Sequence, residues 1–196
     1  MKHYNLYRGI LQLAFVLVFT SLVYSCLSSK KEETPLPTAT DVNEATIDDS
    51  DKQNDAQFIV KASEISLMEI KLGKLAQQIG SSKTIRDLGK MMETEHTKSL
   101  VEVTEIAKTK MITIPTTPSF DAEDAYKTLN TKSSTDFDKA YSDMMVNGHQ
   151  EAIALFEKTC NDSDDTDIRD WTTKTLPTLK MHLTNAQMAQ KEAMSK

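Results

Sequence analysis

The sequence predicts an all-α protein, and three observations lead to that class. Glycine and proline number only five each in 196 residues, which is too few turn residues for an all-β sandwich. The repeated Val- and Ile-rich runs of a parallel α/β sheet are not found in the sequence. Apolar residues instead recur at helical spacing from residue 55 onward. The length suits one domain with appended segments.

The first 25 residues have the pattern of a signal peptide, with Lys2 and Arg8 ahead of an apolar run over residues 10–23. This run is too short and too often interrupted by polar residues to predict a membrane span. It ends next to Cys26 in a context that resembles a bacterial lipobox, so we expect Cys26 to be lipidated after cleavage. The alternative is ordinary signal-peptidase cleavage, which would leave Cys26 as a free thiol.

The segment after Cys26 predicts where the domain lies and how it is attached. Leu27 rather than an aspartate follows the cysteine, so we expect an outer-membrane lipoprotein that faces the periplasm or the cell surface. Residues 28–53 contain almost no apolar side chains that could offset the entropy cost of folding, and they predict a disordered tether. The predicted domains are a signal peptide (1–25), the lipidated cysteine with its tether (26–53) and a four-helix bundle (54–194).

The net charge excludes some partners. A formal charge of −6 and a pI near 5.3 argue against a broad basic face that binds nucleic acid or anionic lipid. We therefore expect contact with a membrane through the N-terminal lipid anchor only, and no nucleic-acid partner. Cys160 is the other cysteine of the chain, so the domain must be stabilised by its core and not by a disulfide.

The first two helices of the domain are predicted to form an antiparallel pair. Apolar residues at 58, 65, 72 and 79 recur every seven positions and predict a helix over residues 55–79, which Gly80 ends. Ser81 or Ser82 is expected to cap the second helix, whose apolar positions keep helical spacing as far as Ile106. The turn between the two helices is short, so they must run in opposite directions.

The second half of the domain predicts another such pair. Prolines break the pattern between residues 111 and 134, where only 121–129 has helical spacing, so this segment predicts a long crossover with a short helix. A third long helix is expected from Thr135 or Asp136, and a fourth, kinked by Pro177, follows an Asp-rich turn. Two antiparallel pairs joined by one long connection predict a ferritin-like four-helix bundle.

Four residues with metal-binding side chains fall on the apolar stripes of the predicted helices. His96, His149 and His182 lie on three different helices, and Glu69 lies on the apolar face of the first. One carboxylate and three imidazoles in a bundle interior suit a transition metal such as zinc, iron or copper. The sequence thus predicts a metal or small-ligand site. The alternative is a non-catalytic envelope interaction or stress-related structural module without metal, in which these residues form core hydrogen bonds.

The spacing of the residues argues against two more specific sites, a dinuclear metal centre and a calcium-binding loop. Glu93-x-x-His96 matches the spacing of ferritin-like metal helices, but Val146 and Leu179 occupy the corresponding positions before the other two histidines. The sequence therefore does not favour a dinuclear oxidase, and it predicts no catalytic residue. The aspartates of residues 162–167 resemble a calcium loop but lack its glycine and its final glutamate, so we interpret them as helix caps.

Four segments also carry a family resemblance. They are Glu69-Ile-Lys-Leu-Gly-Lys-Leu-Ala76, Met92-x-x-x-His96, Phe137-Asp-x-x-Tyr141-x-x-x-Met145-x-x-x-His149 and Leu176-Pro-x-Leu-x-x-His182-Leu. Over residues 55–190 the chain resembles the exported bacterial family called domain of unknown function 4142. The resemblance implies a ferritin-like bundle in the outer membrane or periplasm with no established activity. It also implies that Glu69 and the three histidines occupy the characteristic positions of the family.

Overall fold

The computed structural model describes residues 38–196, of which 84% are helical, and these residues contain no strand. The all-α class predicted from the sequence is confirmed. The helices are α1 (Ala39–Thr46), α2 (Ser50–Ile79), α3 (Lys83–Thr109), α4 (Phe120–Asn130), α5 (Ser134–Asp162) and α6 (Thr166–Met194). None of these helices is both long and apolar enough to cross a membrane. The predicted signal peptide and Cys26 lie outside the described residues.

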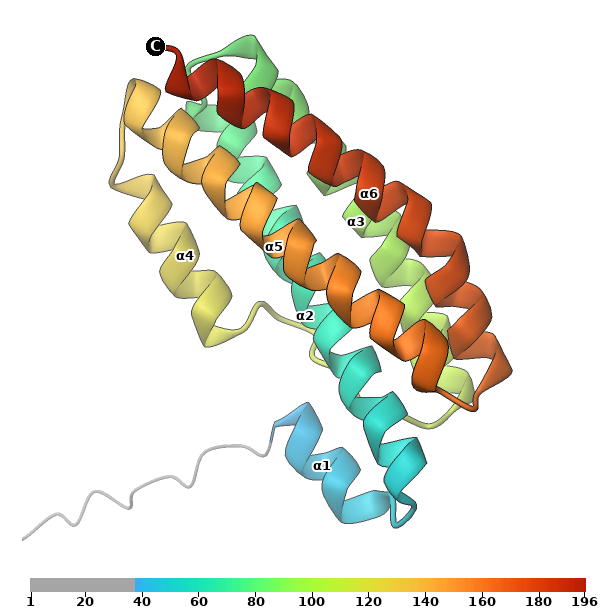
Figure 1. Ribbon diagram of the computed structural model, residues 1–196. Coiled ribbons are helices and arrows are strands. Elements are labelled where there is room, and N and C mark those ends of the chain that lie inside the picture. The colour runs from blue at the N-terminus through green and yellow to red at the C-terminus, as the bar shows by residue number, and fades with distance from the viewer. Residues whose placement is uncertain (1–37) are drawn as a thin grey trace, which may run out of the picture. The chain divides into compact units, whose positions relative to one another are not determined.

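The four long helices pack as two hairpins. Helix α2 packs along α3, and α5 packs along α6, while α2 also contacts α5 and α3 contacts α6. Figure 1 shows these four helices running side by side, with α4 on the connection between the hairpins. Helix α4 rests on α2 and α5, where Lys71 pairs with Glu123 and lies over the ring of Tyr126. The predicted pairs and the short helix of the connection are therefore present.

The helix ends agree with most of the predicted caps. Gly80 ends α2, and the Ser82 hydroxyl accepts the backbone N–H of Ile85 at the start of α3. Asp165 caps α6, so the Asp-rich turn is a helix cap as predicted. Helix α6 continues without interruption through Pro177.

The structure differs from the predicted tether over residues 39–53, because α1 forms there and α2 begins at Ser50. The buried side chain of Asn43 explains the difference. Its amide nitrogen donates to the carbonyl of Thr113, and its amide oxygen accepts the N–H of Thr113, both at 2.8 Å. These two hydrogen bonds fix α1 to the connection after α3. Helix α1 is short and carries one large apolar residue, Val42, which is too few to mark it in the sequence.

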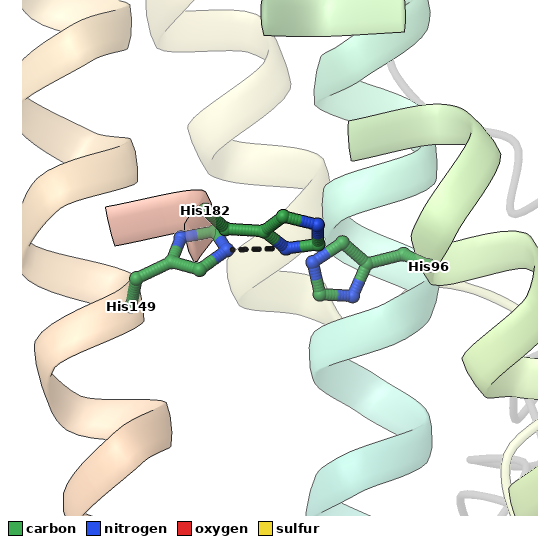
Figure 2. A group of neighbouring side chains, drawn as sticks. All are labelled: His96, His149 and His182. Atoms are coloured by element: carbon green, nitrogen blue, oxygen red, sulfur yellow. Dashed lines mark hydrogen bonds between the residues drawn. The ribbon is translucent and has the colours of Figure 1, made fainter. Parts of the chain in front are cut away.

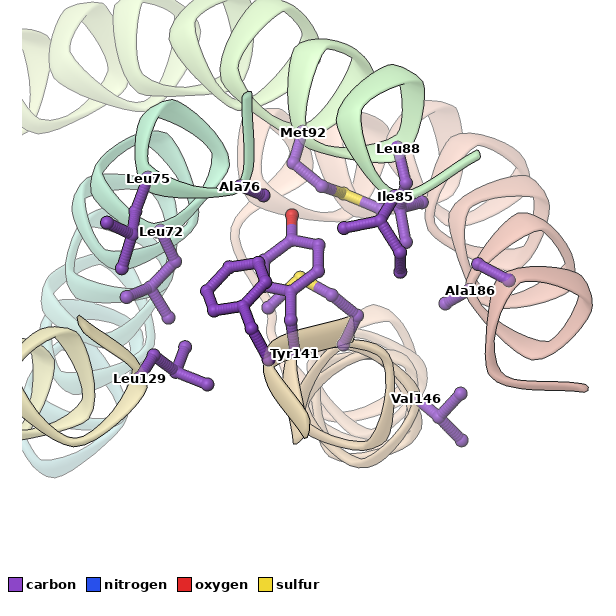
Figure 3. Close-up of a cluster of buried hydrophobic side chains, with 13 residues drawn as sticks. Leu72, Leu75, Ala76, Ile85, Leu88, Met92, Leu129, Tyr141, Val146 and Ala186 are labelled. Atoms are coloured by element: carbon purple, nitrogen blue, oxygen red, sulfur yellow. The ribbon is translucent and has the colours of Figure 1, made fainter. Parts of the chain in front are cut away.

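The core consists of two apolar clusters. One surrounds the stacked rings of Phe137 and Tyr141, and Figure 3 shows Tyr141 extending from α5 toward Ala76 and Met92. The other cluster contains the aromatic residues Phe58, Phe156 and Trp171, whose ring centroids lie 5.0 to 5.9 Å apart. Along each long helix, the residues of one cluster are followed by those of the other. Between them lies a layer of buried polar side chains: Ser66, Glu69, His96, His149 and His182.

Candidate metal centre

Three histidines from three helices meet in the polar layer between the two apolar clusters. His96 comes from α3, His149 from α5 and His182 from α6, and none of them is more than 3% exposed. Figure 2 shows the three rings pointing toward one another. One nitrogen of each ring lies within 4.8 Å of a nitrogen of both others, and the ring centroids are 5.3 to 5.6 Å apart. The convergence predicted from the helical stripes is present.

The backbone of α5 determines which nitrogen of His149 faces the group. The Nδ1 atom of His149 lies 2.8 Å from the carbonyl oxygen of Met145, one turn earlier. Because a carbonyl oxygen can only accept, Nδ1 must carry the hydrogen and donate it. The Nε2 atom then has a lone pair, which accepts a hydrogen bond from Nδ1 of His182 at 3.3 Å in the metal-free protein. A hydrogen bond from the far nitrogen that fixes the ring in this way is typical of metal-binding histidines.

Several polar atoms of the layer have no hydrogen-bond partner within residues 38–196. They are both ring nitrogens of His96, Nε2 of His182, Oε2 of Glu69 and the hydroxyl of Tyr141. Each buried polar group left without a partner costs about 1 to 3 kcal/mol, so such groups are rare in folded proteins. Three of these atoms are imidazole nitrogens of one group. An ion coordinated by the imidazoles would satisfy the nitrogens that face it.

The three imidazoles are neutral at pH 7 because their surroundings oppose protonation. Burial lowers the pKa of His96 well below its ordinary value, and the neighbouring His149 and His182 lower it further. Burial and His149 lower the pKa of His182 to about 4, against a small opposing effect of Glu95. Burial also lowers the pKa of His149, although its hydrogen bond to Met145 acts in the opposite direction. A neutral imidazole is the form that binds metal ions.

The structure places Glu69 next to the histidines but outside their group. Its Oε1 atom lies 3.9 Å from Nδ1 of His149, whereas the other nitrogen of that ring, Nε2, faces His182. Within residues 38–196, the set of side chains whose ligand atoms all lie within 4.8 Å of one another contains the three histidines and not Glu69. Burial raises the pKa of Glu69 to about 8, so its carboxyl group carries a proton at neutral pH.

Tyr141 is a polar residue of this region that the sequence reasoning did not select. Its hydroxyl group is buried, and burial together with the charge of Glu69 raises its pKa well above the ordinary value. Tyr141 precedes His149 by eight residues on the apolar stripe of α5, so it lies on the same face of the helix. That spacing is the signal that could have identified it.

The residues that would extend the site to two metals lie elsewhere or are apolar. The carboxylate of Glu93 accepts a hydrogen bond from Gln77 at 2.7 Å and pairs with Lys74 at 3.8 Å, so α2 holds it away from the histidines. Val146 and Leu179 are buried apolar residues. Among residues 38–196, the histidine group therefore lacks the additional carboxylate ligands of a dinuclear centre.

Comparison with known proteins gives one match. The profile of a family described as "Domain of unknown function (DUF4142)" matches residues 40–189, which include Glu69 and all three buried histidines. No curated protein and no solved structure matches the chain. Because the family profile covers most of the sequence, the resemblance inferred from the four segments is confirmed. The chain belongs to the DUF4142 family of domains of unknown function.

Proposed function

We propose that the protein binds one transition-metal ion through His96, His149 and His182. One observation carries the proposal: three neutral imidazoles converge in the buried interior, and one of them, His96, has no partner for either of its ring nitrogens within the described residues. Imidazole is a good ligand for zinc, copper and iron. Three protein ligands leave a fourth tetrahedral position free for water or a small ligand.

The distances between the nitrogens suit such an ion after small ring movements. Bonds of about 2.1 Å in a tetrahedral site place neighbouring ligand nitrogens about 3.4 Å apart. The contact between His149 and His182, at 3.3 Å, already has this length. The nitrogen of His96 lies within 4.8 Å of both, so it must come closer by rotation of its ring to complete the triangle.

The surrounding fold and the N-terminus complete the proposal. The two hairpins, joined by a long connection that carries α4, support a ferritin-like four-helix bundle as the scaffold. The sequence before residue 38 supports an envelope lipoprotein whose bundle is attached to the outer membrane through lipid on Cys26. Mass spectrometry of the mature N-terminus tests this part, and a mature protein that begins at any residue other than a lipidated Cys26 would contradict it.

Calorimetric titration of the metal-free protein with zinc tests the binding proposal. We expect the wild type to bind one ion per chain. His182→Gln keeps most of the side-chain volume, so we expect affinity to fall at least about tenfold while the stability of the metal-free form changes by less than about 1 kcal/mol. The control is Met181→Leu, a change at a half-exposed neighbour on the same helix, which should leave affinity unaltered.

Absence of zinc, copper and iron binding by the wild type would contradict the proposal. The chain would then be better described as a structural or interaction module whose histidines are core residues. Unchanged affinity in His182→Gln would remove His182 from the site.

A further inference from the structure

The histidine group is closed off from solvent, so an ion needs a route to reach it. Each of the three histidines is at most 3% exposed. A pocket of about 710 Å³ opens on the surface between α2 and α5, and one of the residues that line it is Glu69. Because Glu69 also lies 3.9 Å from His149, this pocket comes within one side chain of the histidine group. It is therefore a candidate access route.

Glu69 is a nearly buried residue in the wall of this pocket. It is 6% exposed, and its Oε2 atom has no hydrogen-bond partner within the described residues. Gly148 lines the same pocket, and a Cβ atom at that position would lie 3.6 Å from Oε1 of Glu69. With glycine at 148, no side chain stands between this part of the pocket wall and the carboxyl group. Glu69 thus lines the pocket and also lies beside His149, the residue that follows Gly148 in the chain.

Four other side chains of the pocket suit a transition-metal ion on its way inward, while Lys61, also in the wall, pairs with Glu64. The pocket is lined by the carboxylates of Asp143 and Glu151 and by the thioethers of Met68 and Met144. Carboxylates attract cations, and thioethers bind copper and other soft metals. Moving a bare cation from water into an apolar interior is costly unless a group of opposite charge accompanies it. Glu69 is the acid of this pocket that lies next to a histidine of the group, and an ion that binds its carboxyl group displaces the proton held there, which leaves through the pocket.

We propose that metal ions reach the three histidines through the pocket between α2 and α5, and that Glu69 passes the ion from the pocket to His149. This inference rests on the proposed function. The ring of His149 links the two places: its Nδ1 atom, which donates to the carbonyl of Met145, lies 3.9 Å from Oε1 of Glu69, and its Nε2 atom faces His182. For the ion to pass from the carboxylate to the three imidazoles, this single ring must release its hydrogen bond to Met145, swing, and form the bond again once the ion is bound. Glu69 is then a residue of the access route and not a permanent ligand.

Stopped-flow mixing of the metal-free protein with cobalt(II) tests this route, because the visible absorption of cobalt reports its coordination directly. For Glu69→Gln we expect the association rate to fall at least about tenfold and the dissociation rate to fall equally, which leaves Kd within about twofold of the wild type. Gly148→Val, which adds bulk between the pocket and Glu69, should slow both rates as well. The matched control is Glu95→Gln, because Glu95 is an acid on α3 that acts electrostatically on His182 but does not line the pocket. Its rates should stay within about twofold of the wild type.

Two results would overturn the access route. If Glu69→Gln binds cobalt as fast as the wild type, or slows no more than Glu95→Gln, the ion does not pass Glu69. If Kd weakens by as much as the association rate falls, Glu69 is a ligand of the bound ion. Failure of the wild type to bind cobalt would instead refute the proposed function itself, so the two failures are distinguishable.

Discussion

Replacing His96 with leucine is expected to stabilise the metal-free protein and to prevent its stabilisation by zinc. Both ring nitrogens of His96 are buried without a partner in residues 38–196. Leucine has a similar volume and no polar atom, so the metal-free variant should gain about 1 to 3 kcal/mol in free energy of unfolding. With zinc at about 100 times its Kd, the wild type gains about 2.7 kcal/mol that the variant lacks. In chelator the variant should therefore be the more stable protein. In zinc the difference in free energy of unfolding between the two proteins should become smaller or change sign.

Thermal and urea unfolding with chelator and with zinc measures this effect. Met92→Leu is the matched control, since Met92 is fully buried one turn earlier on the same stripe and the exchange conserves volume. It should change stability by less than about 1.5 kcal/mol and equally in both conditions. Equal destabilisation of His96→Leu in chelator and in zinc would mean that His96 is a structural core residue.

The stability of the metal-free protein is expected to fall as the pH rises from 6.5 to 8, because of Glu69. Its pKa is raised from 4.5 to about 8 by burial, so the folded state holds a proton that the unfolded state has released. When folding raises a pKa, the contribution to stability is complete at pH values below the pKa of the unfolded state. It is lost as the pH rises toward and through the pKa of the folded state. The slope is about 1.4 kcal/mol per pH unit, which gives a loss of about 2 kcal/mol across this window.

The histidines act in the opposite direction and at lower pH. Their pKa values are lowered from 6.5, so below this pH the unfolded state takes up protons that the folded state does not bind. Stability is therefore lost as pH falls below 6.5, and His182 contributes to this loss down to about pH 4. Together the two groups predict a maximum of stability near pH 6.5 in the metal-free protein.

Urea unfolding in chelator between pH 5 and pH 8 tests both slopes, with Glu69→Gln as the comparison. The variant should keep the loss of stability below pH 6.5 and show no fall between 6.5 and 8, because glutamine does not titrate. If the free energy of unfolding of the wild type changes as little as that of the variant between pH 6.5 and 8, Glu69 is already ionised in the folded state.

The convergence of the three histidines could be predicted because it follows from local pattern. Each histidine lies on the apolar stripe of a long helix, and a stripe must face the interior when the helices pair. The cap at Ser82 and the short helix of the connection follow from equally local signals. These features could be predicted from the spacing of residues along the sequence alone.

The features that could not be predicted depend on contacts between distant residues. Helix α1 is held by Asn43 and Thr113, which lie 70 positions apart and are both polar. Glu93 has the spacing of a metal ligand relative to His96, yet Gln77 and Lys74 on the neighbouring helix hold it away. The position of Glu69 beside the group, and not in it, depends on the rotation of α2 relative to α5. Helical spacing gives the face of a residue but does not resolve such rotations.

Elemental analysis of the protein, purified from its native envelope without an affinity tag, tests the central claim most directly. The measurement compares the wild type with His149→Gln. This substitution removes the imidazole ring and with it the Nε2 lone pair that faces His182. We predict one transition-metal ion per chain in the wild type and none in the variant. Wild-type protein without metal, or equal metal content in the two proteins, would contradict a metal centre at His96, His149 and His182.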